Sequence, residues 1–234
     1  MSANVSVVLE PLAPIEVRNP YDDSLIGTVP SCGREDVRRA IERAAGYDFR
    51  LTAWERYEIL HQLCGLLQKH HDEFVELIAL ESGKTLKDCV VEVKRSYQTF
   101  LLSAEEAKRI NGEVLPIDAA AGMKKGMGLV VREPIGVVVA ITPFNYPLNL
   151  VAHKVGPALA ANNPVVLKPS GLTPLTAIRM VELLMEAGLP EEMMQVVHGD
   201  AALIGDELVT HPKVAKVTFT GSGEVGQKIC ARMT

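Results

Sequence analysis

The pattern of hydrophobic and polar positions becomes regular from Gly128 to the end of the chain. Short apolar runs without polar alternation are separated there by stretches of helical periodicity. Such runs are typical of strands covered on both faces, and helical connections make these strands parallel with right-handed crossovers. The pattern predicts a doubly wound α/β sheet with strands at VVVAIT (137–142), PVVLK (164–168), MMQVVH (193–198) and KVTFT (216–220).

One helix between these strands has well-marked ends in the sequence. We expect Thr173 as its N-cap and Pro174 at its first helical position, where the missing N–H of proline costs nothing. Gly188 is expected after the last turn, and Pro190 stops the helix.

The residues before position 128 follow a different pattern. NPYDDSLIGTVP (19–30) predicts a β-hairpin closed by its Asp-Asp-Ser turn. The stretch GLVVREPIG (128–136) is strand-like, and we expect it to pair with that hairpin in a separate small sheet. Helices are expected at REDVRRAIERAA (34–45), after a capping box from Thr52 to Glu55, at 71–82 and at 84–110.

These patterns divide the chain into three parts. We assign the hairpin and helices to residues 1–127, a β segment to 128–136 and the α/β core to 137–234.

Composition narrows the classes of partner. The net charge of −5 gives no basic surface for nucleic acid or an anionic membrane. Because no secretory signal pattern or membrane-length apolar segment occurs, we expect a soluble cytoplasmic protein without nucleic-acid or membrane partners. The cysteines lack metal-ligand or redox spacing, so we expect reduced thiols and no metal site.

Polar residues follow the predicted strands at their carboxyl ends, where ligands bind in parallel α/β sheets. Lys168 ends the second strand, where it is better placed to meet ribose hydroxyls or a phosphate than bulk solvent. His198 closes the third strand. Asn145, after the first, either caps the next helix or donates its side-chain NH2 to a developing oxyanion. The turn G-S-G-E-V-G (221–226) fits either phosphate binding or tight strand-to-helix packing.

Taken together, ITPFNYP (141–147), Lys168-Pro-Ser and FTGSGEVG (219–226) resemble the NAD(P)-binding half of the aldehyde dehydrogenase superfamily. The resemblance is closest to non-phosphorylating glyceraldehyde-3-phosphate, lactaldehyde or phosphonoacetaldehyde dehydrogenases. It implies a Rossmann-like fold with a small β oligomerisation hairpin, and a homo-oligomer, commonly a dimer or tetramer. Further similar landmarks, which extend it over essentially the whole chain, are NPYDDSLIGTVP, Trp54 with Arg56, Glu81-Ser-Gly-Lys84 and Arg132-Glu-Pro-Ile-Gly.

The resemblance implies oxidation of an aldehyde to the carboxylic acid with NAD or NADP. It makes Asn145 the side-chain half of the oxyanion hole, and Lys154 a support for proton movement near the catalytic centre. The alternative for Lys154 is a surface helix lysine, and that for Gly205 is a plain turn glycine. The cofactor-binding residues it implies are Ile141, Thr142, Pro143, Phe144, Lys168, Ser170, Gly171, Gly205, Gly221, Ser222 and Val225.

The resemblance places Arg95, Tyr146 and His153 at the substrate mouth. Cationic groups there favour an anionic aldehyde, such as a phosphorylated or phosphonate aldehyde. The alternative is that Arg95 pairs with Glu92 or with a neighbouring helix, as a solvated charge.

Two departures from the family pattern matter. Gly171 stands where the family commonly has a Glu that accepts the ribose hydroxyls, which favours NADP or dual use. The family's nucleophilic Cys and general-base Glu lie beyond the glycine-turn helix, and Cys230 lies inside that helix and is no substitute. We therefore expect this chain alone to bind cofactor without catalysis. The alternatives are a truncated homologue acting as a nucleotide-binding or oligomerisation module, and a scaffold that binds no nucleotide.

Overall fold

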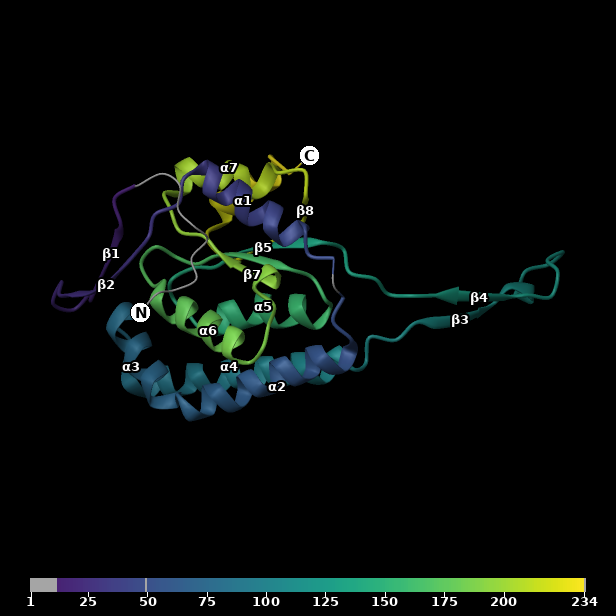
Figure 1. Cartoon of the computed structure of the whole chain (residues 1–234), viewed down its shortest axis with the longest axis horizontal. Helices are drawn as coiled ribbons and strands as arrows, with labels where there is room; N and C mark the ends of the chain where they lie inside the picture. Colours follow the sequence, from purple (N-terminus) through teal and green to yellow (C-terminus); the bar gives the residue numbers. More distant parts are fainter. Residues whose placement is uncertain (1–11, 49, 234) are drawn as a thin grey trace.

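A computed structural model describes residues 12–48 and 50–233. At its centre lies a parallel sheet with the strand order β7-β6-β5-β8, which confirms the predicted doubly wound arrangement. The chain enters the sheet at β5, runs outward through β6 to β7, and returns to the other side of β5 as β8 (Figure 1). The strands are β5 (Val137–Ile141), β6 (Val165–Lys168), β7 (Met194–Val196) and β8 (Val214–Phe219).

Helices cover both faces of the sheet. Successive strand residues point to opposite faces, so each strand contributes side chains to both layers of helices. Val138 and Ala140 belong to the larger apolar cluster, which includes α5 and α6. Val137 and Val139 belong to a second cluster with α1 and α7, against which Ile229 of α8 packs. Burial on both faces explains why the strand lacks polar alternation. The covering helices are α1 (Arg34–Ala45), α5 (Asn149–Ala160), α6 (Leu175–Glu186), α7 (Ala201–Thr210) and α8 (Gly223–Cys230).

An outer layer of helices lies beyond α5 and α6 (Figure 1). It consists of α2 (Ala53–Lys69), α3 (His71–Ser82) and α4 (Leu86–Ala107). The predicted capping box starts α2: Thr52 Oγ1 accepts from the Glu55 N–H at 3.2 Å, and the Glu55 carboxylate accepts from the Thr52 N–H at 2.7 Å.

The outer layer meets the inner one where α4 crosses α5. A Cβ atom added at Gly156 of α5 would lie 2.6 Å from Ser103 Oγ and 3.3 Å from a ring carbon of Phe100. Since carbon and oxygen do not approach so closely without bonding, Gly156 permits a helix contact that alanine would push apart.

Two antiparallel hairpins lie beside these layers. β1 (Ile15–Arg18) pairs with β2 (Leu25–Val29), which confirms the predicted N-terminal hairpin, and Asp23 in its turn has a positive φ of 58°. β3 (Glu113–Pro116) pairs with β4 (Met127–Val130), and this β3–β4 ribbon projects from the rest of the molecule (Figure 1). Single turns of 3-10 helix occur at Ile117–Ala119 and Glu191–Met193.

The expected pairing of residues 128–136 with the N-terminal hairpin is wrong. The strand in that region pairs with β3, with Val130 opposite Glu113 and Met127 opposite Pro116. A partner about a dozen residues away closes a much shorter loop than one about a hundred residues away, so the local pairing costs less chain entropy.

The expected start of α6 shifts by one residue. Pro174 occupies the N-cap position in place of Thr173, and the helix begins at Leu175. The side chain that satisfies its first N–H groups is Glu81 of α3, whose carboxylate accepts from Leu175 N at 2.9 Å and Thr176 N at 3.0 Å. The predicted C-terminal signal is confirmed, because Gly188 has a left-handed φ of 90° just after the helix.

Three further observations concern the described residues as a set. Among residues 12–48 and 50–233, no helix combines the length and apolarity that crossing a membrane requires. The same residues contain no group of three or more His, Cys, Asp or Glu placed to hold a metal ion. Cys32, Cys64 and Cys89 are buried free thiols and Cys230 is an exposed one, and burial raises the pKa of Cys64 to about 12.

Candidate functional site

The carboxyl ends of three neighbouring strands bring most of the predicted site together. Ile141 of β5 lies opposite Lys168 of β6 and opposite Phe219 of β8. Beyond the strands, Thr142 N donates to the Lys168 carbonyl and Thr220 N donates to the Ile141 carbonyl, both at 3.2 Å. The strand order reverses between β5 and β8, and this switch point is where α/β sheets bind their ligands.

Lys168 is a half-buried cation at this edge. Burial lowers the pKa of its ammonium, while Asp200 opposes that shift. The ammonium donates to the Pro169 carbonyl at 3.4 Å, a contact that leaves its other hydrogens available to a ligand. Lys168 is therefore not a fully solvated surface lysine, and its contact with a ligand stays a prediction.

His198 lies behind Lys168, just after β7. It is 1% exposed, and its Nε2 has no hydrogen-bond partner among the described residues. Burial, with a smaller effect of the Lys168 charge, lowers its pKa from 6.5 to about 3, so the imidazole is neutral near pH 7. The sequence placed His198 at this edge but gave no sign of its neutral state.

The glycine turn contains one residue that contacts an aromatic ring and one that caps a helix. A Cβ atom at Gly221 would lie 2.4 Å from the Phe219 ring, so a side chain there would displace that ring. Ser222 is the N-cap of α8, and its Oγ accepts from Val225 N at 3.4 Å. The N–H groups of an eight-residue helix thus begin at the same sheet edge as Lys168.

Gly205 and Gly171 have open space where a side chain would be. Gly205 lies within α7, so the alternative that it is a turn glycine is wrong. A Cβ at either position would meet nothing within 4 Å. Ser170, beside Gly171, accepts from Leu172 N through its Oγ at 3.2 Å and so shapes the loop after β6.

Asn145 does not cap α5, so the capping alternative is wrong. Leu148 occupies the N-cap position without a side-chain cap of its own. Glu92 of α4 takes that role, because its Oε1 accepts from Leu148 N at 2.9 Å and Asn149 N at 3.2 Å. Asn145 is exposed between Phe144 and Tyr146, in the segment that leaves β5 after Thr142 and Pro143.

Lys154 is a buried residue of α5, and the surface-lysine alternative is wrong. Its side chain points at β8, where Nζ donates to Thr220 Oγ1 at 2.7 Å and lies 3.4 Å from Thr218 Oγ1. Burial lowers the pKa of Lys154. His153, next along the helix, is exposed, and both residues line a cavity of about 200 Å³ between α5 and β8.

Arg95 and Tyr146, both predicted at the substrate mouth, come from different elements. Arg95 is exposed on α4, as the solvated-charge alternative has it, but its pairing with Glu92 is wrong, because Glu92 pairs with Lys84 at 2.7 Å. The Lys84 ammonium lies 3.5 Å from the centroid of the Tyr146 ring.

Sequence reasoning missed the contacts of Lys84 and Glu92. A signal was available for Glu92, because it lies on the same helical stripe as Cys89, Val93 and Ser96, all of which are buried. A glutamate on an otherwise buried stripe indicates a partner in the interior.

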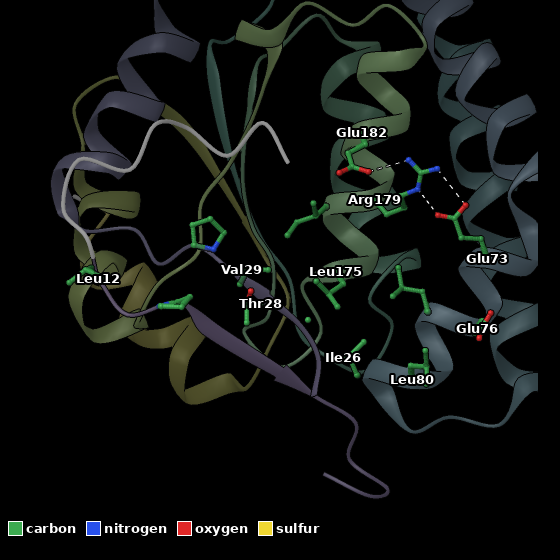
Figure 2. Close-up of a pocket in the computed structure, with 15 residues that line it drawn as sticks. Leu12, Ile26, Thr28, Val29, Glu73, Glu76, Leu80, Leu175, Arg179 and Glu182 are labelled. Atoms are coloured by element: carbon green, nitrogen blue, oxygen red, sulfur yellow. Dashed lines mark hydrogen bonds and ion pairs between the residues drawn. The ribbon is translucent and has the colours of Figure 1, made fainter. Parts of the chain in front are cut away.

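A cavity of about 830 Å³ lies away from this edge, between β2, α3 and α6. None of the predicted site residues lines it (Figure 2). Its cation, Arg179, is held by Glu73 at 2.6 Å and Glu182 at 3.1 Å. Because two carboxylates already neutralise Arg179, this cavity offers a poor site for a phosphate.

Comparison with known proteins identifies relatives of this arrangement. A family model described as the aldehyde dehydrogenase family matches residues 9–234. The chain is 44% identical over 216 residues to 3-sulfolactaldehyde dehydrogenase of Priestia megaterium, covering 92% of this chain and 45% of that protein. It is 39% identical over 224 residues to the NADP(+) succinate-semialdehyde dehydrogenase of Escherichia coli, covering 93% and 46%.

Solved structures agree with these relatives. The NADP-dependent glyceraldehyde-3-phosphate dehydrogenase of Bacillus halodurans, complexed with NADP, superposes with a TM-score of 0.91 at 39% identity. The match covers 95% of this chain and 48% of that one. The chain thus spans about half the length of the relatives it matches.

Proposed function

This chain belongs to the aldehyde dehydrogenase family, and on that premise we propose that it is the NAD(P)-binding part of an enzyme that oxidises an aldehyde to its carboxylic acid. The observation that carries the proposal is the shared sheet edge at the switch point. At this edge β6 ends at Lys168, the segment with Asn145 leaves β5, and α8 begins after β8.

The residues at this edge fit a nicotinamide dinucleotide. Lys168 supplies a half-buried ammonium for ribose hydroxyls or a phosphate. Ser222 and the first N–H groups of α8 suit a pyrophosphate, because the helix dipole favours an anion there. Gly171 places no carboxylate against a 2′-phosphate, which supports NADP or dual use. When bound, the coenzyme accepts the hydride that leaves the aldehyde carbon.

Asn145 and Lys154 supply the polar groups for the reacting end. The amide of Asn145 is exposed and not used as a helix cap, so it is available to donate to the oxyanion that develops on the substrate carbonyl. Lys154 is buried against Thr220 with a lowered pKa, so it gives up a proton more easily than a surface lysine does.

In the proposed reaction, none of the four cysteines of this chain acts as the nucleophilic thiol. Cys32, Cys64 and Cys89 are buried, and burial raises the pKa of each, which opposes formation of a thiolate. Cys230 is exposed and is the last residue of α8, whereas Asn145 lies in the segment after β5.

The proposed substrate is a small anionic aldehyde. Arg95 is exposed and forms no ion pair with a described residue, so its guanidinium is available to a carboxylate, sulfonate or phosphate. The names of the relatives add support, because sulfolactaldehyde, succinate semialdehyde and glyceraldehyde-3-phosphate all carry an anionic group.

The proposed enzyme self-associates through the β3–β4 ribbon. Support comes from its exposed apolar side chains, since a two-stranded ribbon projecting into water is marginal alone. The β1–β2 hairpin is a weaker candidate, because Val17 and Val29 are buried in the core. The exposed ribbon residues are Val114, Leu115, Met127, Leu129 and Val131.

Coenzyme binding gives the first test. Lys168→Met should weaken NADP binding by about tenfold or more, because it removes a charge-assisted contact of about 1.5–3 kcal/mol. Isothermal titration of the full-length protein measures the loss, and Lys213→Met, beyond the opposite end of the sheet, serves as the matched control. Equal affinity in all three proteins would contradict the proposed site, and absence of binding to NAD and NADP in the wild type would contradict the proposed function.

A further inference from the structure

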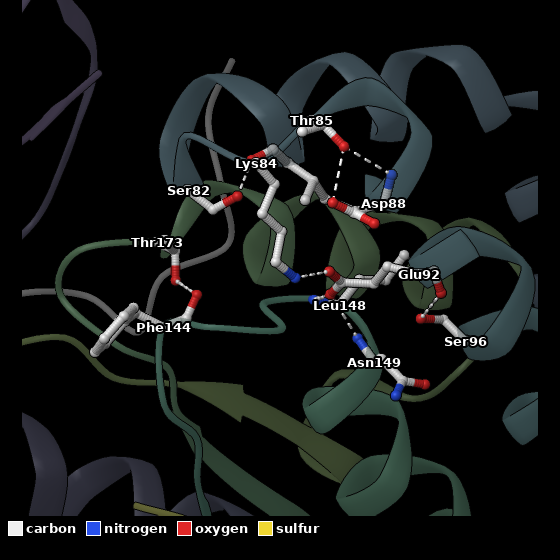
Figure 3. A network of polar contacts seen from close by, with 11 residues as sticks. Ser82, Lys84, Thr85, Asp88, Glu92, Ser96, Phe144, Leu148, Asn149 and Thr173 are labelled. Atoms are coloured by element: carbon white, nitrogen blue, oxygen red, sulfur yellow. Dashed lines mark hydrogen bonds and ion pairs between the residues drawn. The ribbon is translucent and has the colours of Figure 1, made fainter. Parts of the chain in front are cut away.

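A buried carboxylate and a partly buried ammonium lie close to the segment that carries Asn145. Lys84 follows Gly83, whose left-handed φ of 68° turns the chain from α3 into α4. Glu92 is on α4, and its side chain is fully buried, whereas the side chain of Lys84 is 19% exposed. The Lys84 ammonium donates to Glu92 Oε2 at 2.7 Å, as Figure 3 shows.

The second carboxylate oxygen of Glu92 holds the start of α5. Oε1 accepts from Leu148 N and Asn149 N, so one carboxylate joins a lysine of the outer layer to a helix of the inner layer (Figure 3). The N-terminal end of the α5 dipole and the Lys84 ammonium both face the Glu92 carboxylate with positive charge. This arrangement satisfies a charge that would be costly to bury alone.

Lys84 also fixes an aromatic ring beside Asn145. Its ammonium lies 3.5 Å from the centroid of Tyr146, within the range of a cation–π contact, and the residue is 40% exposed. The Tyr146 carbonyl accepts from Leu150 N at 3.0 Å, which ties the same residue to the first turn of α5. Both ends of the short segment 146–149 are therefore held by the Lys84–Glu92 pair.

We propose that Lys84 and Glu92 are positioning residues of the aldehyde site, which hold the Tyr146 ring and the start of α5 and thereby set the place of the Asn145 amide. This role rests on the proposed function, and neither side chain needs to touch the substrate. Beyond the Glu92 cap of α5, fold stability gives little reason for the ion pair itself, because buried ion pairs replaced by apolar groups often cost no stability.

The main variant is Lys84→Met combined with Glu92→Gln in the full-length protein. The glutamine carbonyl can still accept from the α5 N–H groups, and no uncompensated carboxylate is left in the interior. We expect kcat/KM for the aldehyde to fall about tenfold, the scale of a desolvated cation–π contact, while NADP affinity stays within about twofold. Lys84→Arg keeps the charge and should restore most of the loss. Lys87→Met, at an exposed position of the same helix, should match the wild type.

A double-mutant cycle separates positioning from general destabilisation. If Lys84 acts through the ring, Tyr146→Leu should lower kcat/KM, and adding the Lys84–Glu92 substitutions should lower it little further. Effects that multiply, or an unchanged kcat/KM in the main variant, would overturn the proposal.

A second measurement does not depend on turnover. Hydrogen–deuterium exchange should be faster at residues 145–150 in the main variant than in the wild type, with no such change in Lys87→Met. If the wild type oxidises no aldehyde, the proposed function fails, yet exchange still decides whether the pair holds this segment. Unchanged exchange at 145–150 would refute the positioning role.

Discussion

The neutral, buried His198 gives a sharp prediction about stability and pH. Its pKa is about 3 in the folded protein and about 6.5 when unfolded. A depressed folded pKa means that the unfolded chain binds the proton first, so stability is present at neutral pH and is lost as the pH falls below about 6.5. On acidification from about pH 7 to about pH 5, His198 therefore lowers the free energy of unfolding by about 2 kcal/mol.

A second buried group acts in the opposite direction. Burial raises the pKa of Glu81 from 4.5 to about 7, so the folded protein binds this proton first and gains stability on acidification. Over the same interval Glu81 contributes a gain of about 2 kcal/mol. In the wild type the loss from His198 and the gain from Glu81 nearly cancel, so the free energy of unfolding changes little between these pH values. Without His198, only the gain from Glu81 remains.

The perturbation is His198→Gln, and the assay is urea unfolding at about pH 7 and about pH 5. Far-UV circular dichroism is the appropriate signal, because the only tryptophan, Trp54, is 58% exposed and reports poorly on the core. We compare the free energy of unfolding of the variant with that of the wild type at each pH. This difference should shift in favour of the variant by about 2 kcal/mol between about pH 7 and about pH 5. The exposed His61 provides the control His61→Gln, whose difference from the wild type should not change. A stability difference for His198→Gln that is the same at both pH values would refute the reasoning.

Two further predictions concern the substrate mouth and the helix contact. Arg95→Ala in the full-length enzyme should raise KM for an anionic aldehyde by about tenfold and leave KM for a neutral aldehyde nearly unchanged. Lys94→Ala, at the exposed neighbouring position, is the control. Equal effects on KM for both aldehydes would contradict an anion site. Gly156→Ala should destabilise the protein by about 1–3 kcal/mol because of the contact with Ser103, whereas Gly65→Ala in α2, with open space around it, should stabilise it by about 1 kcal/mol. Urea unfolding measures both glycine variants, and changes of the same sign would contradict the packing argument.

The sheet could be predicted because its signal is local. β5, β6 and β7 each read as an apolar run in the sequence, and the run itself reports burial on both faces. The expected burial of β8 on both faces is wrong, because its residues are only partly buried or exposed. The same locality explains α2, whose capping box is complete within four residues. The strand ends placed Lys168 and Asn145 at one edge, since the carboxyl ends of parallel strands meet there.

What the sequence could not reveal depends on contacts between distant residues. Glu81 caps α6 from 94 residues away, and Glu92 caps α5 from 56 residues away. A glutamate in a helix normally faces solvent. The buried stripe around Glu92 signals a partner in the interior, but no local pattern identifies that partner as the start of α5. The pairing of β3 with β4 was missed for another reason: both strands are short and largely exposed, so they lack a regular apolar alternation.

The two glutamate caps bind the layers into one cooperative folding unit. α5 and α6 receive N-terminal hydrogen bonds from α4 and α3, so these bonds form only when the outer layer is docked on the inner one. A chimera that borrowed only the segment from β5 onward would inherit bare helix ends and an uncovered face. Any graft of this coenzyme-binding region into another protein would need to carry its outer helices with it.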